Sequence, residues 1–217
     1  MEMMPSPWCP PDPVPRAWRT ERLVLRAFEH ADAPSLFAAI DSGREALGRW
    51  LPWARTEHLE PGITHFEIER FRRQWGAGSF EPGIGYVMAI VDAGTGEILG
   101  GTGLHRFDCA AHEAEIGYWI RPDRQGRGIA TEATAHLLSW AFTAPHEGGW
   151  GLRRVTICCA ESNTASRRVP EKLGLRLECH KLGHRWSEGV GWDGTLGWAV
   201  LAEAWDRTRH GLVASAR

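Results

Sequence analysis

The chain has 217 residues, of which 43% are hydrophobic and 24% are charged, a composition that fits one moderately large globular domain. Its net charge of −2 provides no broad basic surface, so we expect no nucleic-acid partner. No apolar run approaches the roughly 18 residues that span a membrane, and the five cysteines lack the regular spacing of a disulfide framework. Cys179, His180 and His184 form an incomplete ligand set. We therefore expect a cytoplasmic protein with reduced thiols, no membrane partner and no metal.

The N-terminal segment is rich in proline, which favours extended backbone and disfavours helix and sheet. Chain ends of this kind are often poorly tied to the rest of a domain. We expect residues 1–19 to form a flexible arm outside the core and residues 20–217 to form the folded domain.

Hydrophobic periodicity divides the domain into short strands and helices. Alternating apolar residues predict strands, whereas apolar residues at spacings of three and four predict amphipathic helices. The predicted strands cover residues 22–28, 86–91, 97–104, 114–120, 154–159, 176–182 and 192–201. The predicted helices cover residues 32–40, 61–75, 129–141 and 163–173. This order predicts an α+β domain with one mixed sheet and helices on its faces.

Residues 124–130, Arg-Gln-Gly-Arg-Gly-Ile-Ala, lie between a predicted strand and a predicted helix. Glycine permits backbone conformations that a Cβ would block, and the first amides of a helix lack internal partners and attract phosphate groups. The segment therefore indicates a phosphate-binding turn, to which Arg124 and Arg127 add positive charge. Its G-x-G-x-A spacing differs from the dinucleotide-binding G-x-G-x-x-G, and it lacks the G-K-[S/T] of a P-loop. A tight turn without a ligand is the remaining alternative at this point.

Four segments in sequence order resemble the GNAT superfamily of N-acetyltransferases, and more closely its RimJ/RimL-like branch, which acetylates the N-termini of ribosomal proteins. Residues 125–130 resemble the pyrophosphate loop, and the similarity continues through residues 131–133. Residues 114–120, 163–175 and 50–53 resemble, in turn, the central strand, the second coenzyme-contacting helix and the acceptor-side segment. The likeness covers roughly residues 20–207.

This resemblance implies a fold and an activity. The GNAT fold is a single, mixed and mostly antiparallel sheet whose central parallel strands splay apart to admit the pantetheine arm of acetyl-coenzyme A (acetyl-CoA). The implied enzyme is an N-acetyltransferase that uses acetyl-CoA as co-substrate and an amine as acceptor. The favoured acceptor is the α-amine of a protein or peptide N-terminus, which would attack the thioester directly in a ternary complex. The alternatives are acetylation of a small amine, such as an aminoglycoside or polyamine, and a non-catalytic acyl-CoA sensor. Similar proteins are often dimers, so a homodimer is compatible with the sequence.

The resemblance also assigns the donor site to two stretches of the chain. Backbone groups of Trp119, Ile120 and Arg121 would pair with the pantetheine amides. The pyrophosphate would be held by seven consecutive residues, which are Gln125, Gly126, Arg127, Gly128, Ile129, Ala130 and Thr131.

Acetyl transfer needs a neutral amine, and an alkyl amine with a pKa of about 10 is mostly protonated at neutral pH, so a general base assists the reaction. Glu115 is the candidate base, because strand alternation places it on the same face as Gly117 and Trp119. A surface glutamate, or one that only orients the substrate, is the alternative interpretation.

The group that assists the leaving thiolate is less evident. Many relatives use a tyrosine shortly after the asparagine motif, but this chain has only Tyr86 and Tyr118, and neither lies in that region. The resemblance offers Ser166 near the sulfur instead, with Asn163 against the pantetheine arm. The two are three residues apart and share one side of a helix, although Asn163 also fits a helix cap. Pro170 predicts a kink in this helix, or a helix that has only just begun.

The residues of the acceptor side are predicted from their positions in the sequence alone. Trp50, Trp53 and Trp75 fall where relatives build their acceptor groove, and His105 ends a predicted strand near the site, with a structural role as its alternative. Acidic residues in the groove would favour a polycationic acceptor. The candidates for this are Glu57, Glu60, Glu67 and Glu69.

Overall fold

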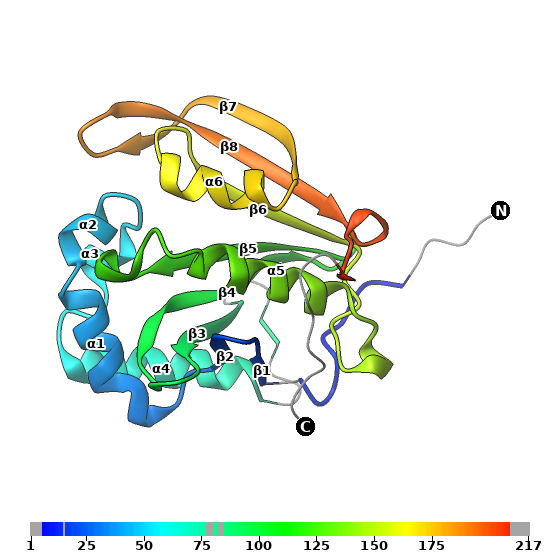
Figure 1. The fold of residues 1–217 in the computed structure, drawn as a ribbon, viewed down its shortest axis with the longest axis horizontal. Helices are drawn as coiled ribbons and strands as arrows, with labels where there is room; N and C mark the ends of the chain where they lie inside the picture. Colours follow the sequence, from blue (N-terminus) through cyan, green and yellow to red (C-terminus); the bar gives the residue numbers. More distant parts are fainter. Residues whose placement is uncertain (1–5, 15, 77–79, 82–84, 209–217) are drawn as a thin grey trace.

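One sheet of eight strands, in the order β1-β2-β3-β4-β5-β6-β8-β7, runs through the computed structural model (Figure 1). The structure describes residues 6–14, 16–76, 80–81 and 85–208. The strands are β1 (Ala17–Arg19), β2 (Leu23–Ala27), β3 (Tyr86–Asp92), β4 (Ile98–Asp108), β5 (Glu113–Ile120), β6 (Arg154–Ala160), β7 (Arg176–Ser187) and β8 (Gly191–Leu201). The α-helices are α1 (Ala33–Asp41), α2 (Arg44–Gly48), α3 (Trp53–Thr56), α4 (Pro61–Gln74), α5 (Ile129–Phe142) and α6 (Thr164–Lys172).

The centre of the sheet holds its one parallel pair. All other neighbouring strands are antiparallel, whereas β5 and β6 run parallel. The two strands pair at three positions, the last of which joins Glu115 to Thr156, although β5 continues to Ile120 and β6 to Ala160. The strands therefore part beyond Glu115. The predicted α+β fold, with a mostly antiparallel mixed sheet and splayed central parallel strands, is confirmed.

Side chains of β5 alternate between two layers of helices. Ile116 lies in a buried cluster with Leu138 of α5 and Val169 of α6, whereas Trp119 packs against a second cluster that includes Ile40 of α1 and Ile68 of α4. Strand alternation therefore places Glu115 on the α1–α4 side of the sheet and Tyr118 on the α5–α6 side. This separation determines which groups can meet at the gap between β5 and β6.

The periodic pattern located the long elements and missed the short ones. β1, α2 and α3 were not predicted, because elements of three to five residues contain too little of a period to be recognised. β4 also continues to Asp108, so His105 lies inside the strand and does not end it.

The prediction that residues 1–19 stay outside the core is wrong for two tryptophans. Trp8 is 6% exposed, and its indole nitrogen donates to the Trp150 carbonyl at 2.7 Å. Trp18 lies on β1, which pairs with β2, and its ring contacts that of Trp140 on α5. Large aromatic side chains gain enough from burial to hold a proline-rich segment against the domain.

Candidate active site

The loop between β5 and α5 forms a cradle with an open helix N-terminus. Gly126 and Gly128 have φ angles of 76° and 78°, a left-handed conformation that favours glycine. Gly128 is the N-cap of α5 and has no side chain with which to cap it. The first amides of α5 therefore point outward toward any anion that enters, in line with the helix dipole. These features suit a pyrophosphate.

The negative charge of Glu132, in the first turn of α5, is offset by its hydrogen-bonding partners beside the cradle. The Glu132 carboxylate accepts hydrogen bonds from Thr20 and from Arg22, the latter at 2.5 Å. The Arg124 guanidinium is bound to Glu97 at 2.6 Å, whereas Arg127 is exposed and its guanidinium donates to the Asp123 carbonyl at 3.4 Å. Arg127 is thus the better placed of the two arginines to meet a phosphate.

Space for a ligand continues beside the cradle. A cavity of about 320 Å³ lies between the first two turns of α5 and the end of α6. The N-cap Gly128 lines it, together with Thr131 and His136 of α5 and Lys172 of α6. An anion or a polar ring held at the N-terminus of α5 would have this cavity as its neighbour.

The three predicted pantetheine-contacting residues lie at the end of β5 and directly after it, next to the cradle. The Gln125 side chain donates to the Ile120 carbonyl at 3.0 Å, and the Arg121 amide donates to the Leu99 carbonyl at 2.9 Å. Trp119 packs edge-to-face on Trp53, with ring centroids 5.9 Å apart. The Arg121 amide is therefore already bonded within the sheet, whereas the Ile120 carbonyl, which holds one hydrogen bond from Gln125, has a second lone pair for a ligand.

Glu115 lies at the point where β5 and β6 separate. Its side chain is 19% exposed and is bound by Arg106 at 3.1 Å. His105 is its partner across β4 and β5, and the His105 ring lies over the bare backbone of Gly117. The structure thus brings the predicted base and the predicted acceptor contact His105 together on one face.

Cys158 adds a thiol to the same face. Its side chain reaches solvent, but the protein packed around it and then the Glu115 carboxylate raise the pKa of the thiol to about 12. Cys158 therefore stays protonated near neutral pH and is a poor nucleophile beside the predicted base.

Ser166 is fixed at three of its atoms on the other face of the gap. Its amide donates to the Asn163 side chain at 3.1 Å, which makes Asn163 the cap of α6. Its carbonyl accepts from the Tyr118 hydroxyl at 2.9 Å, and its own hydroxyl donates to the Tyr118 oxygen at 3.2 Å. Burial raises the pKa of Tyr118, so the phenol stays neutral.

Tyr118 is the residue that the sequence analysis missed. Tyr118 was set aside because it lies far along the chain from the asparagine motif, yet the fold brings its hydroxyl to Ser166. Two signals were present in the sequence. Strand alternation placed Tyr118 on the face opposite Glu115. Pro170, which has no amide hydrogen, indicated that its helix would lack one backbone hydrogen bond.

The three tryptophans predicted to line the acceptor groove lie in different surroundings. Trp53 contacts Trp119 and the buried His58, and Trp50 lies under the Arg49 guanidinium, 4.9 Å from the ring centroid. Trp75 is 3% exposed and packs in the core against Tyr86, so its predicted place in the groove is wrong.

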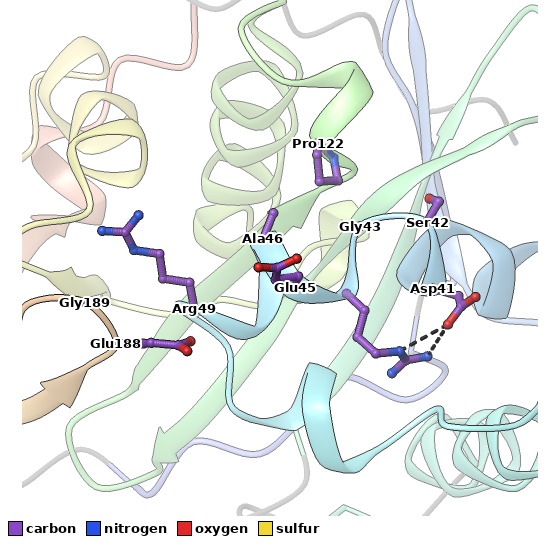
Figure 2. A pocket seen from close by; sticks show the side chains of 10 residues that line it. Asp41, Ser42, Gly43, Glu45, Ala46, Arg49, Pro122, Glu188 and Gly189 are labelled. Carbon is purple, nitrogen blue, oxygen red and sulfur yellow. Dashed lines mark hydrogen bonds and ion pairs between the residues drawn. The ribbon is translucent and has the colours of Figure 1, made fainter.

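A larger cavity, of about 700 Å³, lies between the α1–α2 turn, Pro122 and the tip of the β7–β8 hairpin. Figure 2 shows Arg49 and Glu188 on one side of it and Asp41 on the other. Asp41 is ion-paired with Arg44, which also lines the cavity. Contacts of Arg55 with Glu188 and of Arg185 with the Trp50 carbonyl hold the hairpin to the α2–α3 region. The cavity thus opens beside the end of β5 and has a lining of both charges.

The described residues contain no group of three or more histidine, cysteine, aspartate or glutamate side chains placed to hold a metal ion. None of their helices combines the length and the apolar character needed to cross a bilayer.

Comparison with known proteins identifies several relatives. The family model described as an acetyltransferase (GNAT) domain matches residues 22–176. YdaF of Bacillus subtilis (strain 168), whose name provisionally describes it as a ribosomal N-acetyltransferase, is 33% identical over 159 residues, which are 73% of this chain and 80% of YdaF. The crystal structure of a probable acetyltransferase matches with a TM-score of 0.74 and 28% identity, over 87% of this chain and 98% of that one. RimJ of Mycobacterium smegmatis, in complex with a CoA-disulfide, matches with a TM-score of 0.68 and 26% identity, over 83% and 82%.

Proposed function

Because the chain belongs to the GNAT acetyltransferase family, we propose that it moves an acetyl group from acetyl-CoA to the α-amine of a peptide or protein N-terminus. The observation that carries this proposal is the gap between β5 and β6. The phosphate cradle lies at its open end, Glu115 borders it on one face and Ser166 borders it on the other. A thioester held in the gap would expose its carbonyl to an amine on the Glu115 side and its sulfur to Ser166.

The residues then have separate roles in a direct transfer. Glu115 takes a proton from the incoming amine, so that the nitrogen can attack the thioester carbon. The carbon–nitrogen bond forms, the carbon–sulfur bond breaks, and its electron pair leaves on sulfur. Ser166 donates a hydrogen bond to that sulfur. Residues 125–131 bind the pyrophosphate, and the main chain near Ile120 faces the reacting carbonyl.

Charge pairing favours a peptide acceptor over a polycation. A polyamine would need several carboxylates without cationic partners. Two of the predicted acidic residues are already engaged, since Glu67 is bound to Arg70, and Glu69 to His30 and Arg73. The mixed lining of the larger cavity suits a chain end that carries polar groups of both kinds. YdaF is named for ribosomal substrates, which further supports a protein acceptor and a cytoplasmic site of action.

An acceptor screen tests this proposal. Release of free thiol from acetyl-CoA should be fast with peptides that carry a free N-terminus and slow with spermidine or an aminoglycoside. A matched peptide with a blocked N-terminus and one internal lysine separates α-amines from side-chain amines. Preference for spermidine would favour the small-amine alternative, and tight acetyl-CoA binding without turnover on any amine would favour the sensor.

A further inference from the structure

We infer that Tyr118 is a positioning residue, which holds the Ser166 hydroxyl at the gap between β5 and β6 in an orientation that serves the leaving sulfur. This inference rests on the proposed acetyl transfer and adds a residue to it. Tyr118 reaches Ser166 across 48 residues of chain and from another strand, and it contacts two different atoms of that one serine.

The first contact exists because of Pro170. In an α-helix, the carbonyl of residue 166 would accept a hydrogen bond from the amide of residue 170. Proline has no amide hydrogen, and α6 continues through Pro170 to Lys172, so the Ser166 carbonyl is left without its helical donor. The Tyr118 hydroxyl, 2.9 Å away, donates to this carbonyl and takes the place of the missing amide. The expectation that α6 has only just begun at Pro170 is therefore wrong, and the proline creates an anchoring point for β5.

The second contact orients the hydroxyl. The Ser166 Oγ donates to the Tyr118 oxygen at 3.2 Å, while Asn163 holds the Ser166 amide at 3.1 Å. Backbone and side chain of Ser166 are thus restrained together, so only the two hydroxyl hydrogens have to turn when charge develops on a nearby sulfur.

Tyr118 acts without giving up its proton. Its hydroxyl lies within hydrogen-bonding distance of both the Ser166 carbonyl and the Ser166 Oγ, so its hydrogen can turn from the first to the second. That rotation frees the Ser166 hydrogen to point at the departing sulfur. Glu115 takes one proton from the protonated amine before attack, and the second nitrogen proton passes to solvent as the amide forms. The electron pair of the broken bond goes to sulfur, and the thiolate takes its proton from solvent.

A double-mutant cycle tests whether Tyr118 works through Ser166. We expect Tyr118→Phe to lower kcat about tenfold while the KM for acetyl-CoA changes less than about twofold. In a Ser166→Ala background the same change should cost nothing further, whereas in a Ser166→Thr background, which keeps a hydroxyl, it should again lower kcat. Tyr86→Phe is the matched control, because it removes the same atom from a buried tyrosine in the aromatic core and should leave kcat unchanged.

Pro170→Ala supplies a second, independent test. It restores an amide donor to the Ser166 carbonyl and competes with Tyr118, so kcat should fall even though the midpoint of thermal unfolding stays equal or rises. A Tyr118→Phe enzyme as fast as wild type, or losses that multiply in the Ser166→Ala background, would overturn the inference. A wild-type protein that releases no thiol with any amine would overturn the proposed function itself, and the inference with it.

Discussion

Glu115 stands where pairing between β5 and β6 ends, and its contribution can be measured by a single substitution. Glu115→Gln keeps the size of the side chain and removes its ability to accept a proton. We expect kcat/KM at pH 7 to fall about 100-fold, the lower end of what a general base contributes. The difference in kcat/KM between the variant and the wild type should decrease as the acceptor amine loses its proton to solvent. This occurs near a pH of about 8 for an α-amine and about 10 for a lysine. The pH profile of the variant therefore also reports the acceptor class.

Glu113→Gln provides the comparison for that measurement. Glu113 lies two residues earlier on the same face of β5, and its carboxylate accepts from Arg154 at 2.6 Å. Its loss should affect stability more than rate. Equal rate losses in the two variants at every pH would show that Glu115 has no special part in proton transfer.

How far single residues could be predicted depends on whether their neighbours lie close in sequence. The cap that Asn163 makes to Ser166 spans three residues and was foreseen as an alternative role. The contact between Tyr118 and Ser166 depends on how β6 leads into α6 beside β5, and no local pattern encodes that approach. The burial of Trp75 likewise depends on its neighbours in the fold, and these neighbours could not be predicted from its position in the sequence.

At the scale of elements, the conformation of the β5–α5 loop can be tested by adding one methyl group. Gly126 has a φ of 76° and open space where a Cβ would lie, so Gly126→Ala strains the backbone without a clash. We expect its free energy of unfolding to fall by about 1–2 kcal/mol. We also expect the Kd for acetyl-CoA, measured by calorimetry, to rise about tenfold, equivalent to about 1.4 kcal/mol, because the strained loop departs from the cradle geometry.

Gly148→Ala is the matched control for the loop. Gly148 follows the far end of α5, with a φ of 83° and equally open space. It should lose a similar amount of stability and bind acetyl-CoA as wild type does. Weakened binding in both variants would mean that global strain, and not the cradle, explains the effect.

Elements were predictable in proportion to their length and regularity. The strand and helix on either side of the cradle carry clear periods, so the site's frame was foreseen with its boundaries nearly right. The separation of β5 from β6 was predicted only from the resemblance to relatives. Strand pairing depends on two segments together, so the pattern of either strand alone does not predict it.

At the scale of the whole molecule, the N-terminal segment belongs to the core that supports the site. Trp8 stacks on Phe107 with ring centroids 5.0 Å apart and is bonded to Trp150. We expect Trp8→Ala to lower the free energy of unfolding in urea by about 3–5 kcal/mol, the usual loss for a buried tryptophan. Trp192→Ala, at a side chain that is 73% exposed, should cost less than about 1 kcal/mol. Equal losses would contradict the packed position of Trp8.

The most direct test of the account is to follow a labelled acetyl group. The protein is incubated with acetyl-CoA carrying an isotopically labelled acetyl group and with a peptide that has one free N-terminus and one internal lysine, and the product is mapped by mass spectrometry. We predict a single labelled acetyl group on the N-terminal nitrogen, formed at a rate that falls in the Glu115→Gln variant. An unlabelled peptide, from a protein that is folded and binds acetyl-CoA, would contradict the proposed transfer.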